Sequence, residues 1–240
     1  MRQITPIVKH LLIINIIVFL GTNLLGSNDF FERLLSLYFP YNPNFKLWQV
    51  LTHMFMHGGF MHLLFNMLAL WMFGTSVEQA IGSKRFVFLY FSAGLGAVLL
   101  QLGIDYFQYT SIFESLQSLG MSVNSIETSS NPEIKAMLNE LWSISNTQMV
   151  GASGCIMGVL VAFGMLNPNA ELMMIFLPIP IKAKYFIPLL VGYDIISGFI
   201  GGVPVFGMNI AHWAHVGGAL IGLIIMYFWK KNQFDKYRWN

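Results

Sequence analysis

The chain has 240 residues, of which 55% are hydrophobic and only 10% are charged. Because soluble domains usually carry about 25% charged residues, this composition excludes an ordinary soluble domain and favours a polytopic membrane protein. A formal net charge of +2 is too small to suggest a nucleic-acid partner. The single cysteine, Cys155, excludes an internal disulfide. No cleavable signal peptide is evident, since no small-residue cleavage site clearly follows the long first apolar run.

Six apolar runs along the chain approach the roughly 20 residues that a membrane-spanning helix needs. Their approximate bounds are Ile7–Leu25, Leu47–Phe73, Phe86–Leu102, Met149–Leu166, Tyr185–Ile200 and Ala211–Trp229. The fifth run is the weakest, because Pro188 and Asp194 lie inside it. The pattern predicts an all-α bundle of six transmembrane helices that forms a single membrane domain over residues 1–240.

The distribution of Lys and Arg predicts the direction of these spans. With the N-terminus in the cytoplasm, ten of the thirteen basic residues fall on the cytoplasmic side and three on the far side. Basic residues concentrate in cytoplasmic loops, so six spans with both termini cytoplasmic fit best, whereas five or seven would spoil the segregation. The ten are Arg2, Lys9, Lys84, Arg85, Lys182, Lys184, Lys230, Lys231, Lys236 and Arg238, and the three are Arg33, Lys46 and Lys135.

Two outer connections are long. The first, Gly26–Lys46, is too apolar for a solvated loop, so we expect it to lie partly in the membrane interface. The second is an outer insertion over about residues 103–148, rich in Ser, Asn and Glu. Within it, Asn131-Pro132-Glu133 is typical of a helix start. Apolar residues follow at helical spacing and predict a short amphipathic helix on the outer membrane surface; the alternative is a disordered insertion.

Polar residues in the second run are candidates for chemistry. His62 and Asn66 are four residues apart and therefore share a helix face. Polar groups are costly inside a membrane and usually face a bundle interior or a cavity, which favours a functional role for this pair. His53 and His57 precede a Gly-Gly pair, nearer the outer surface. For each of them alone we favour a structural role, such as a hydrogen bond that ties a loop to the helix.

The fourth run begins with Gly151-Ala152-Ser153-Gly154. The glycines allow a tight turn into a helix beside Ser153. A helix start leaves backbone N–H groups free, and these could stabilise an oxyanion. The alternative for this motif alone is a serine packed in a small-residue interface, because Gly154 and Gly158 also have the spacing of close helix contacts.

The sixth run supplies a candidate base. His215, Gly218 and Gly222 fall on one helix face. The glycines would let another helix approach closely, so that a serine could come within hydrogen-bond reach of the His215 imidazole, which could then take the serine's proton. His212 lacks such glycines beneath it, so we expect it to be structural or to organise water.

Two carboxylates lie in the apolar runs, and neither is obviously placed to orient His215. Asp194 belongs to the fifth run, and Glu78 to the cytoplasmic end of the second. A Ser–His dyad is therefore preferred to a triad. For Asp194 the structural interpretation is a buried carboxyl that is neutral or paired with a neighbouring helix.

Taken together, Gly-x-Ser-Gly, the His62–Asn66 pair and Ala-His-x2-Gly-x3-Gly resemble the motifs of rhomboid intramembrane serine proteases. The resemblance covers about residues 45–230. It implies that Ser153 is the nucleophile and His215 the general base. It also implies that His62 and Asn66 join the Ser153 N–H in the oxyanion hole.

The resemblance carries further expectations. Glu78 is expected to be structural, the first outer loop to be embedded in the membrane, and the fifth span to move and admit substrate laterally. The partners would be transmembrane protein substrates and the lipid bilayer, with no cofactor and no metal. The short N-terminus and simple layout favour a bacterial plasma membrane. The glycine spacing sets no oligomeric state, because the same glycines serve internal packing.

The chain departs from the family pattern at three places. Trp48 is followed by Gln49 where rhomboids often have arginine, which weakens the expected anchoring of the first loop. Met157 stands where a Tyr or Phe often stacks on the catalytic imidazole, so we expect weaker orientation of His215. The outer insertion is longer than in compact versions of the fold.

Other functions remain open at this stage. The first alternative is a catalytically inactive relative that binds membrane clients, although this chain keeps both the serine and the histidine. A second alternative is a metalloprotease or metal transporter that uses the histidines. The chain, however, lacks the His-Glu-x-x-His motif of such metalloproteases. A plain solute transporter would explain the apolar runs but not the three motifs.

Overall fold

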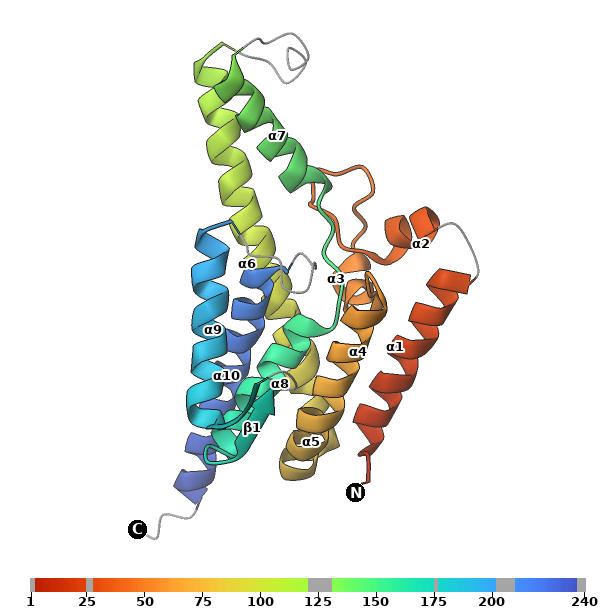
Figure 1. The fold of residues 1–240 in the computed structure, drawn as a ribbon, viewed down its shortest axis with the longest axis vertical. Helices are drawn as coiled ribbons and strands as arrows, with labels where there is room; N and C mark the ends of the chain where they lie inside the picture. Colours follow the sequence, from red (N-terminus) through yellow and green to blue (C-terminus); the bar gives the residue numbers. More distant parts are fainter. Residues whose placement is uncertain (1–2, 25–27, 121–130, 175–176, 202–209, 237–240) are drawn as a thin grey trace.

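The structure is a computed structural model that describes residues 3–24, 28–120, 131–174, 177–201 and 210–236. The described chain is mostly helical (Figure 1). The first half contains α1 (Pro6–Leu24), α2 (Asn28–Leu35), α3 (Gln49–Thr52), the 3-10 turn η1 (His53–Phe55), α4 (Phe60–Ala69), the π-helical turn η2 (Leu70–Gly74), α5 (Thr75–Ile81) and α6 (Ser83–Ser118). The second half contains α7 (Pro132–Asn146), α8 (Ser153–Leu166), β1 (Glu171–Met174), β2 (Leu177–Lys182), α9 (Ala183–Phe199) and α10 (His212–Lys236).

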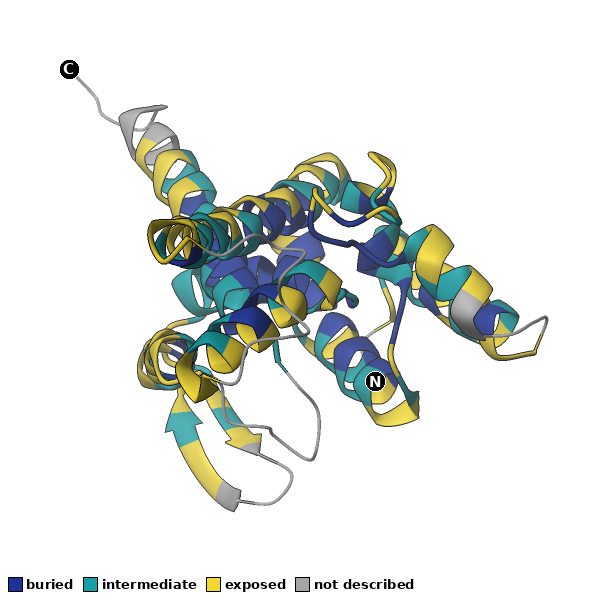
Figure 2. Ribbon diagram, turned by 90° about the horizontal axis from the view of Figure 1, so that it is seen from above, coloured by how far each residue is buried: buried dark blue, intermediate teal, exposed yellow. Residues whose placement is uncertain are grey.

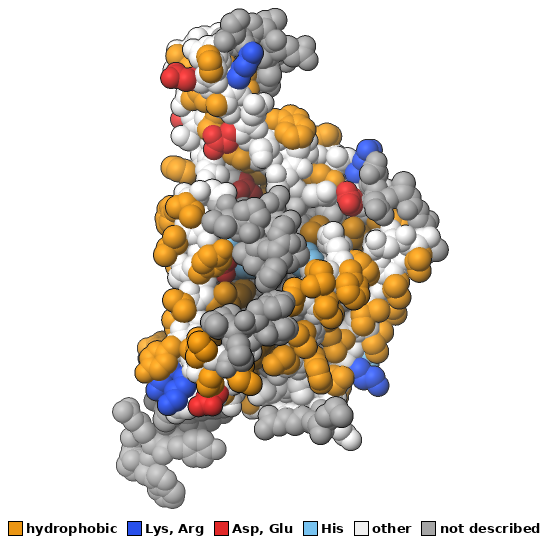
Figure 3. Space-filling model, viewed as in Figure 1, with side chains coloured by type: hydrophobic (Ala, Val, Ile, Leu, Met, Phe, Trp, Pro, Cys, Tyr) orange, Lys and Arg blue, Asp and Glu red, His pale blue; other side chains and the backbone are white. Residues whose placement is uncertain are grey.

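Four helical stretches in the described residues are long and apolar enough to cross a membrane. They are Pro6–Leu24, Phe60–Ile81, Ser83–Ser118 and His212–Lys231. Many large apolar side chains on the outside of the bundle are exposed. On the face in Figure 3 they lie along both sides of the molecule at mid-height, and Lys and Arg side chains lie nearer its ends. The prediction of a helical membrane protein is therefore confirmed.

The centre of the bundle is α8, which packs against both α6 and α10, and these two helices also pack against each other. Its ten consecutive residues Gly154–Phe163 are all buried, and the view in Figure 2 shows the buried residues gathered toward the middle of the molecule. At 14 residues, α8 is about 21 Å long, shorter than the roughly 30 Å hydrocarbon core. An extended segment therefore precedes it. Such backbone is tolerated at membrane depth where protein surrounds it or where it lines a cavity.

Glycines set the distance between α8 and α10. A Cβ atom at Gly218 would overlap the carbonyl oxygen of Gly154, and one at Gly222 would lie 2.6 Å from the Cα of Gly158. Any larger residue at either α10 position would push the two helices apart. The spacing of Gly218 and Gly222 below His215 thus brings the backbone of α8 against this face of α10.

Glu78 ties the start of α1 to the rest of the bundle. Its carboxylate accepts hydrogen bonds from the backbone N–H of Ile7 at 3.2 Å and of Val8 at 3.0 Å, and from the Ser83 hydroxyl at 2.6 Å. The first N–H groups of a helix lack intrahelical partners, so this side chain satisfies two of them in α1. Glu78 is therefore structural in this chain.

The outer insertion forms a helical hairpin that the sequence did not predict in full. The third span was expected to end near Leu102, but α6 continues to Ser118 and is about 54 Å long. The predicted helix after Asn131 is present, and the Asn131 side chain accepts a hydrogen bond from the Glu133 N–H at 2.9 Å. Leu138 and Leu141 of this helix pack against α6, and its expected place on the outer membrane surface stays a prediction.

A second unpredicted element is the antiparallel pair of β1 and β2, which pairs Glu171 with Lys182 and Leu172 with Ile181. It joins α8 to α9 and is a small exception to the all-α prediction. Pro178 and Pro180 lie in β2. Proline lacks the N–H that a helix interior requires and disfavours helical backbone at the residue before it, which explains why this connection is extended.

Candidate active site

Three side chains within residues 48–52 hold the connection that contains α2 against the bundle. Trp48, Gln49 and Thr52 donate hydrogen bonds to three consecutive backbone carbonyls at residues 33–35, where α2 ends. The bonds run from Gln49 Nε2 to Arg33 O (2.8 Å), from Trp48 Nε1 to Leu34 O (2.8 Å) and from Thr52 Oγ1 to Leu35 O (2.9 Å). The last carbonyls of a helix lack intrahelical partners, so these bonds fix the end of α2.

Gln49 corrects the expectation of a weakly anchored loop. Its side-chain amide also donates to the Asn44 carbonyl at 2.9 Å, and its carbonyl oxygen accepts from the Lys46 N–H at 3.0 Å. The residue is fully buried. A neutral amide supplies both donors and an acceptor in this position, so the loop is anchored without the arginine that rhomboids often carry.

The anchored loop in turn positions the segment that leads to Ser153. Leu37 and Met149 exchange two backbone hydrogen bonds of 3.0 and 2.8 Å. The Gly151 N–H donates to the His53 carbonyl at 2.9 Å. Gly151 has φ of +116°, and a Cβ atom there would lie 2.7 Å from Nε2 of His62. Glycine is required at this turn for both reasons.

Ser153 is the first residue of α8, as the flanking glycines predicted. The first hydrogen bond of this helix runs from the Ile156 N–H to the Ala152 carbonyl at 2.9 Å. The N–H groups before Ile156, including that of Ser153, are therefore at the open end of the helix, where backbone donors and the helix dipole favour negative charge.

His62 and Asn66 lie on one face of α4 beside this open helix end. Asn66 is 7% exposed, and its Nδ2 has no hydrogen-bond partner within the described chain. The imidazole of His62 packs edge-on against that of His57, with ring centroids 5.1 Å apart. An unpartnered buried amide donor is unfavourable unless something that accepts a hydrogen bond can enter beside it.

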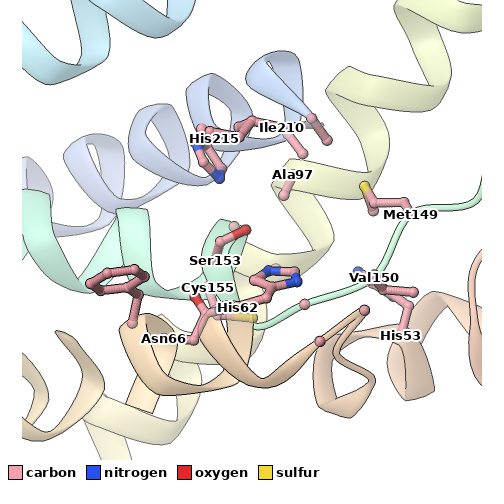
Figure 4. A pocket seen from close by; sticks show the side chains of 18 of the residues that line it. His53, His62, Asn66, Ala97, Met149, Val150, Ser153, Cys155, Ile210 and His215 are labelled. Carbon is pink, nitrogen blue, oxygen red and sulfur yellow. The ribbon is translucent and has the colours of Figure 1, made fainter. Parts of the chain in front are cut away.

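A cavity of about 620 Å³ brings these groups together. Ser153 of α8, His62 and Asn66 of α4, and His215 of α10 all line it, and Gly151 and Gly154 form part of its wall. Figure 4 shows the Ser153 side chain between the imidazoles of His62 and His215. Among the described residues no hydrogen bond joins Ser153 to His215. Such bonds are often long before substrate binds.

A carboxylate lies next to His215, contrary to the sequence-based expectation. One Asp194 oxygen is 2.7 Å from Nδ1 of His212, and both Asp194 oxygens are 3.2 Å from Nδ1 of His215. Asp194 is 2% exposed. Its role could not be assigned from sequence, because the facing of α9 toward α10 depends on packing between the two helices.

Met157, Gly218 and Gly222 lie outside the cavity wall, whereas His53 is part of it. Met157 is buried in the core of α8, and Gly218 and Gly222 form the close contact between α8 and α10. His53 is 2% exposed, and its Nδ1 lies 2.8 Å from the Gln49 carbonyl, which fits the structural role expected for it. In the described part of the chain, no group of three or more His, Cys, Asp or Glu side chains has an arrangement that could hold a metal ion.

The fold and this cavity define a class: a multi-pass helical membrane protein with a serine, three histidines and side-chain amides around one cavity. The rhomboid domain model matches residues 44–232. This chain therefore belongs to the rhomboid family.

Two curated relatives carry the name rhomboid protease GlpG. One is from Klebsiella pneumoniae subsp. pneumoniae and the other from Klebsiella pneumoniae strain 342. Each is 40% identical to this chain over 84 residues, a match that covers 34% of this chain and 29% of the relative. The aligned stretch is thus a limited part of both proteins, and family membership rests on the domain match.

Proposed function

We propose that this protein is an intramembrane serine endopeptidase that cleaves transmembrane segments of membrane-protein substrates near the outer face of the membrane. The observation that carries the proposal is the meeting of Ser153, His215, His62 and Asn66 at one cavity inside a helical membrane protein. These residue types on three helices can supply a nucleophile, a base and oxyanion donors at a common point.

The topology that goes with this function has six spans in a single membrane domain. They are α1, the continuous stretch Phe60–Ile81, α6, α8, α9 and α10, with both termini cytoplasmic in a bacterial plasma membrane. Two observations support it: the ten-to-three bias of basic residues, and the position of the start of α1 and the end of α10 at the same end of the molecule (Figure 1). α8 and α9 are the shorter spans; α8 is buried within the bundle, whereas α9 exposes Leu189, Ile196 and Phe199 on its outer side.

In the proposed reaction, Ser153 and His215 work as a pair. Nε2 of His215 takes the proton of the Ser153 hydroxyl as its oxygen attacks the scissile carbonyl carbon. The resulting tetrahedral intermediate collapses, the C–N bond breaks, and His215 gives its proton to the leaving amine. Water then attacks the acyl-enzyme with His215 again as base, which releases the second product and restores the serine.

The oxyanion of this intermediate would be held by the Ser153 N–H, His62 and Asn66. The free N–H groups at the start of α8 support this assignment, since preorganised donors act strongly where water is excluded. The unpartnered Nδ2 of Asn66 supports it as well, because a developing oxyanion would supply the acceptor that this buried group lacks. Substrate would enter the cavity from the membrane between α4 and α9.

The test is cleavage of a panel of transmembrane substrates by the purified protein in liposomes. We expect the wild-type protein to cleave at least one of them and Ser153→Ala to cleave none. Ser118→Ala, which changes an exposed residue at the end of α6 that does not line the cavity, should match the wild type. Equal cleavage by wild type and Ser153→Ala would contradict the proposed function.

A further inference from the structure

Asp194 is held where it is by packing between the end of α9 and the start of α10. The Phe199 ring packs edge-on against Trp213, with centroids 4.9 Å apart. Gly198 allows this contact, because a Cβ atom there would lie 2.7 Å from the Trp213 ring. Tyr193 packs edge-on against the His212 ring at 5.8 Å. These contacts on both sides of Asp194 direct its carboxylate at the first turn of α10.

The Asp194 carboxylate contacts His212 and His215, in each case at the Nδ1 atom of the imidazole. Nδ1 of His212 lies 2.7 Å from one oxygen, and Nδ1 of His215 lies 3.2 Å from both. An ionised carboxylate only accepts hydrogen bonds, so each Nδ1 must carry a hydrogen to bond it. A neutral imidazole with its hydrogen on Nδ1 has its lone pair on Nε2. For His215 that is the protonation form which a base for Ser153 requires.

The two imidazoles differ in what their other nitrogen meets. His215 lines the cavity together with Ser153, whereas His212 does not. Nε2 of His212 is buried and has no hydrogen-bond partner among the described residues. The shorter contact to His212 can therefore fix the orientation of the carboxylate, while its effect on chemistry passes through His215.

We propose that Asp194 is a positioning residue for the proposed reaction: it fixes the ring orientation and the protonated nitrogen of His215 so that Nε2 faces Ser153. This inference rests on the proposed function. It also gives a physical account of Met157, which is buried in α8 and does not line the cavity. Orientation of the imidazole comes from a carboxylate on α9 and needs no stacked aromatic ring on α8.

The test measures kcat and KM of full-length wild type, Asp194→Ala and Asp194→Asn in liposomes, per folded enzyme. General acid–base catalysis contributes about 10²–10⁴-fold to rate. We expect kcat to fall about 10²-fold in Asp194→Ala with KM within about twofold. Asp194→Asn keeps an oxygen that can accept from one Nδ1–H, so its kcat should lie between those of wild type and Asp194→Ala. If the alanine variant does not fold, the asparagine variant decides.

Ser197→Ala is the matched control, since Ser197 is a buried polar residue of the same helix that is 1% exposed. It should keep the wild-type kcat. A purely structural role for Asp194 would reduce the amount of folded protein and leave kcat per folded enzyme unchanged, which would overturn the inference. If wild type cleaves no better than Ser153→Ala, the proposed function fails and this inference with it, whereas a wild-type kcat in both Asp194 variants overturns only the inference.

Discussion

The cavity and the hairpin of α6 and α7 are built in different ways. Around the cavity, helices touch through glycine backbones and the connections are held by hydrogen bonds between residues far apart in sequence. The hairpin has a small core of its own, in which Leu116, Leu138 and Leu141 are buried with partly buried neighbours. In Figure 1 it projects beyond the end of the bundle at which α2 and α3 lie.

Around the cavity, the exact geometry of the contacts limits which substitutions are tolerated. In the hairpin, only the amount of buried apolar surface affects stability. A glycine contact at backbone distance tolerates no added atom, and an anchored loop depends on particular donors and acceptors. A small apolar cluster loses stability in proportion to what is removed from it, and the three buried leucines of this cluster do not line the cavity. Four predictions test whether the two regions behave in this way.

The largest effect is expected from Gly218→Ala. Its added Cβ atom would overlap the Gly154 carbonyl, so α8 and α10 would have to separate and carry Ser153 away from His215. We expect destabilisation of about 3 kcal/mol, at the upper end for overpacking, and loss of cleavage. Unfolding midpoints in denaturing detergent and the liposome assay measure the two effects.

Gly103→Ala is the matched control, because a Cβ atom there meets nothing within 4 Å. Alanine is favoured over glycine in a helix by up to about 1 kcal/mol, so this variant should be as stable as wild type or slightly more. Equal stability and cleavage in both variants would show that the contact between α8 and α10 is looser than described.

The second prediction concerns Asn66→Ala. Loss of one oxyanion donor typically lowers kcat by about 10²–10³-fold, and we expect a fall in that range. Because Nδ2 of Asn66 has no partner in the described chain, its removal should leave stability nearly unchanged. A lowered unfolding midpoint together with an unchanged kcat per folded enzyme would indicate a structural role and contradict the assignment.

Gln49→Ala is expected to lower stability by less than Gly218→Ala does. The change would leave the carbonyls of Arg33 and Asn44 and the N–H of Lys46 without their partner. Unsatisfied buried groups cost about 1–3 kcal/mol each. Because water can reach part of the loop, we expect the free energy of unfolding to fall by about 2–3 kcal/mol in total. Gln117→Ala, on the exposed surface of the α6 extension, should change the free energy of unfolding by less than about 0.5 kcal/mol.

The smallest effect on cleavage is expected from Leu141→Ala in the hairpin. Large-to-small changes in a core cost about 2–5 kcal/mol. The hairpin core is small, so this loss should appear as faster hydrogen exchange confined to α7 and the end of α6, with cleavage within about twofold of wild type. Trp142→Ala, at a 69% exposed position, is the control. A large loss of cleavage in Leu141→Ala would mean that the hairpin supports the cavity.

Local signals made part of this structure predictable from the sequence. The long apolar runs predicted a helical membrane protein, and Asn131-Pro132-Glu133 predicted the start of α7 because capping depends on neighbouring residues. The glycines at 151 and 154 predicted that a helix begins beside Ser153. Each of these features is encoded within a few residues or one helix face.

Features that depend on contacts between distant segments could not be predicted. The sequence suggested that Gln49 would not anchor the loop. Its hydrogen-bond partners at residues 33, 44 and 46 belong to a segment whose conformation cannot be predicted from its composition. Asp194 did not look placed to orient His215, because nothing in the fifth run says which face of α9 meets α10. The burial of α7 on α6 depended on how far α6 extends past the expected end of its span.

The central claim, that Ser153 is a nucleophile activated by His215, is tested most directly by labelling the full-length protein with a serine-directed fluorophosphonate and locating the adduct by mass spectrometry. We predict an adduct on Ser153 in wild type that is lost in His215→Ala, while His212→Ala retains labelling. An adduct elsewhere in the chain, or undiminished labelling of Ser153 in folded His215→Ala, would contradict the account.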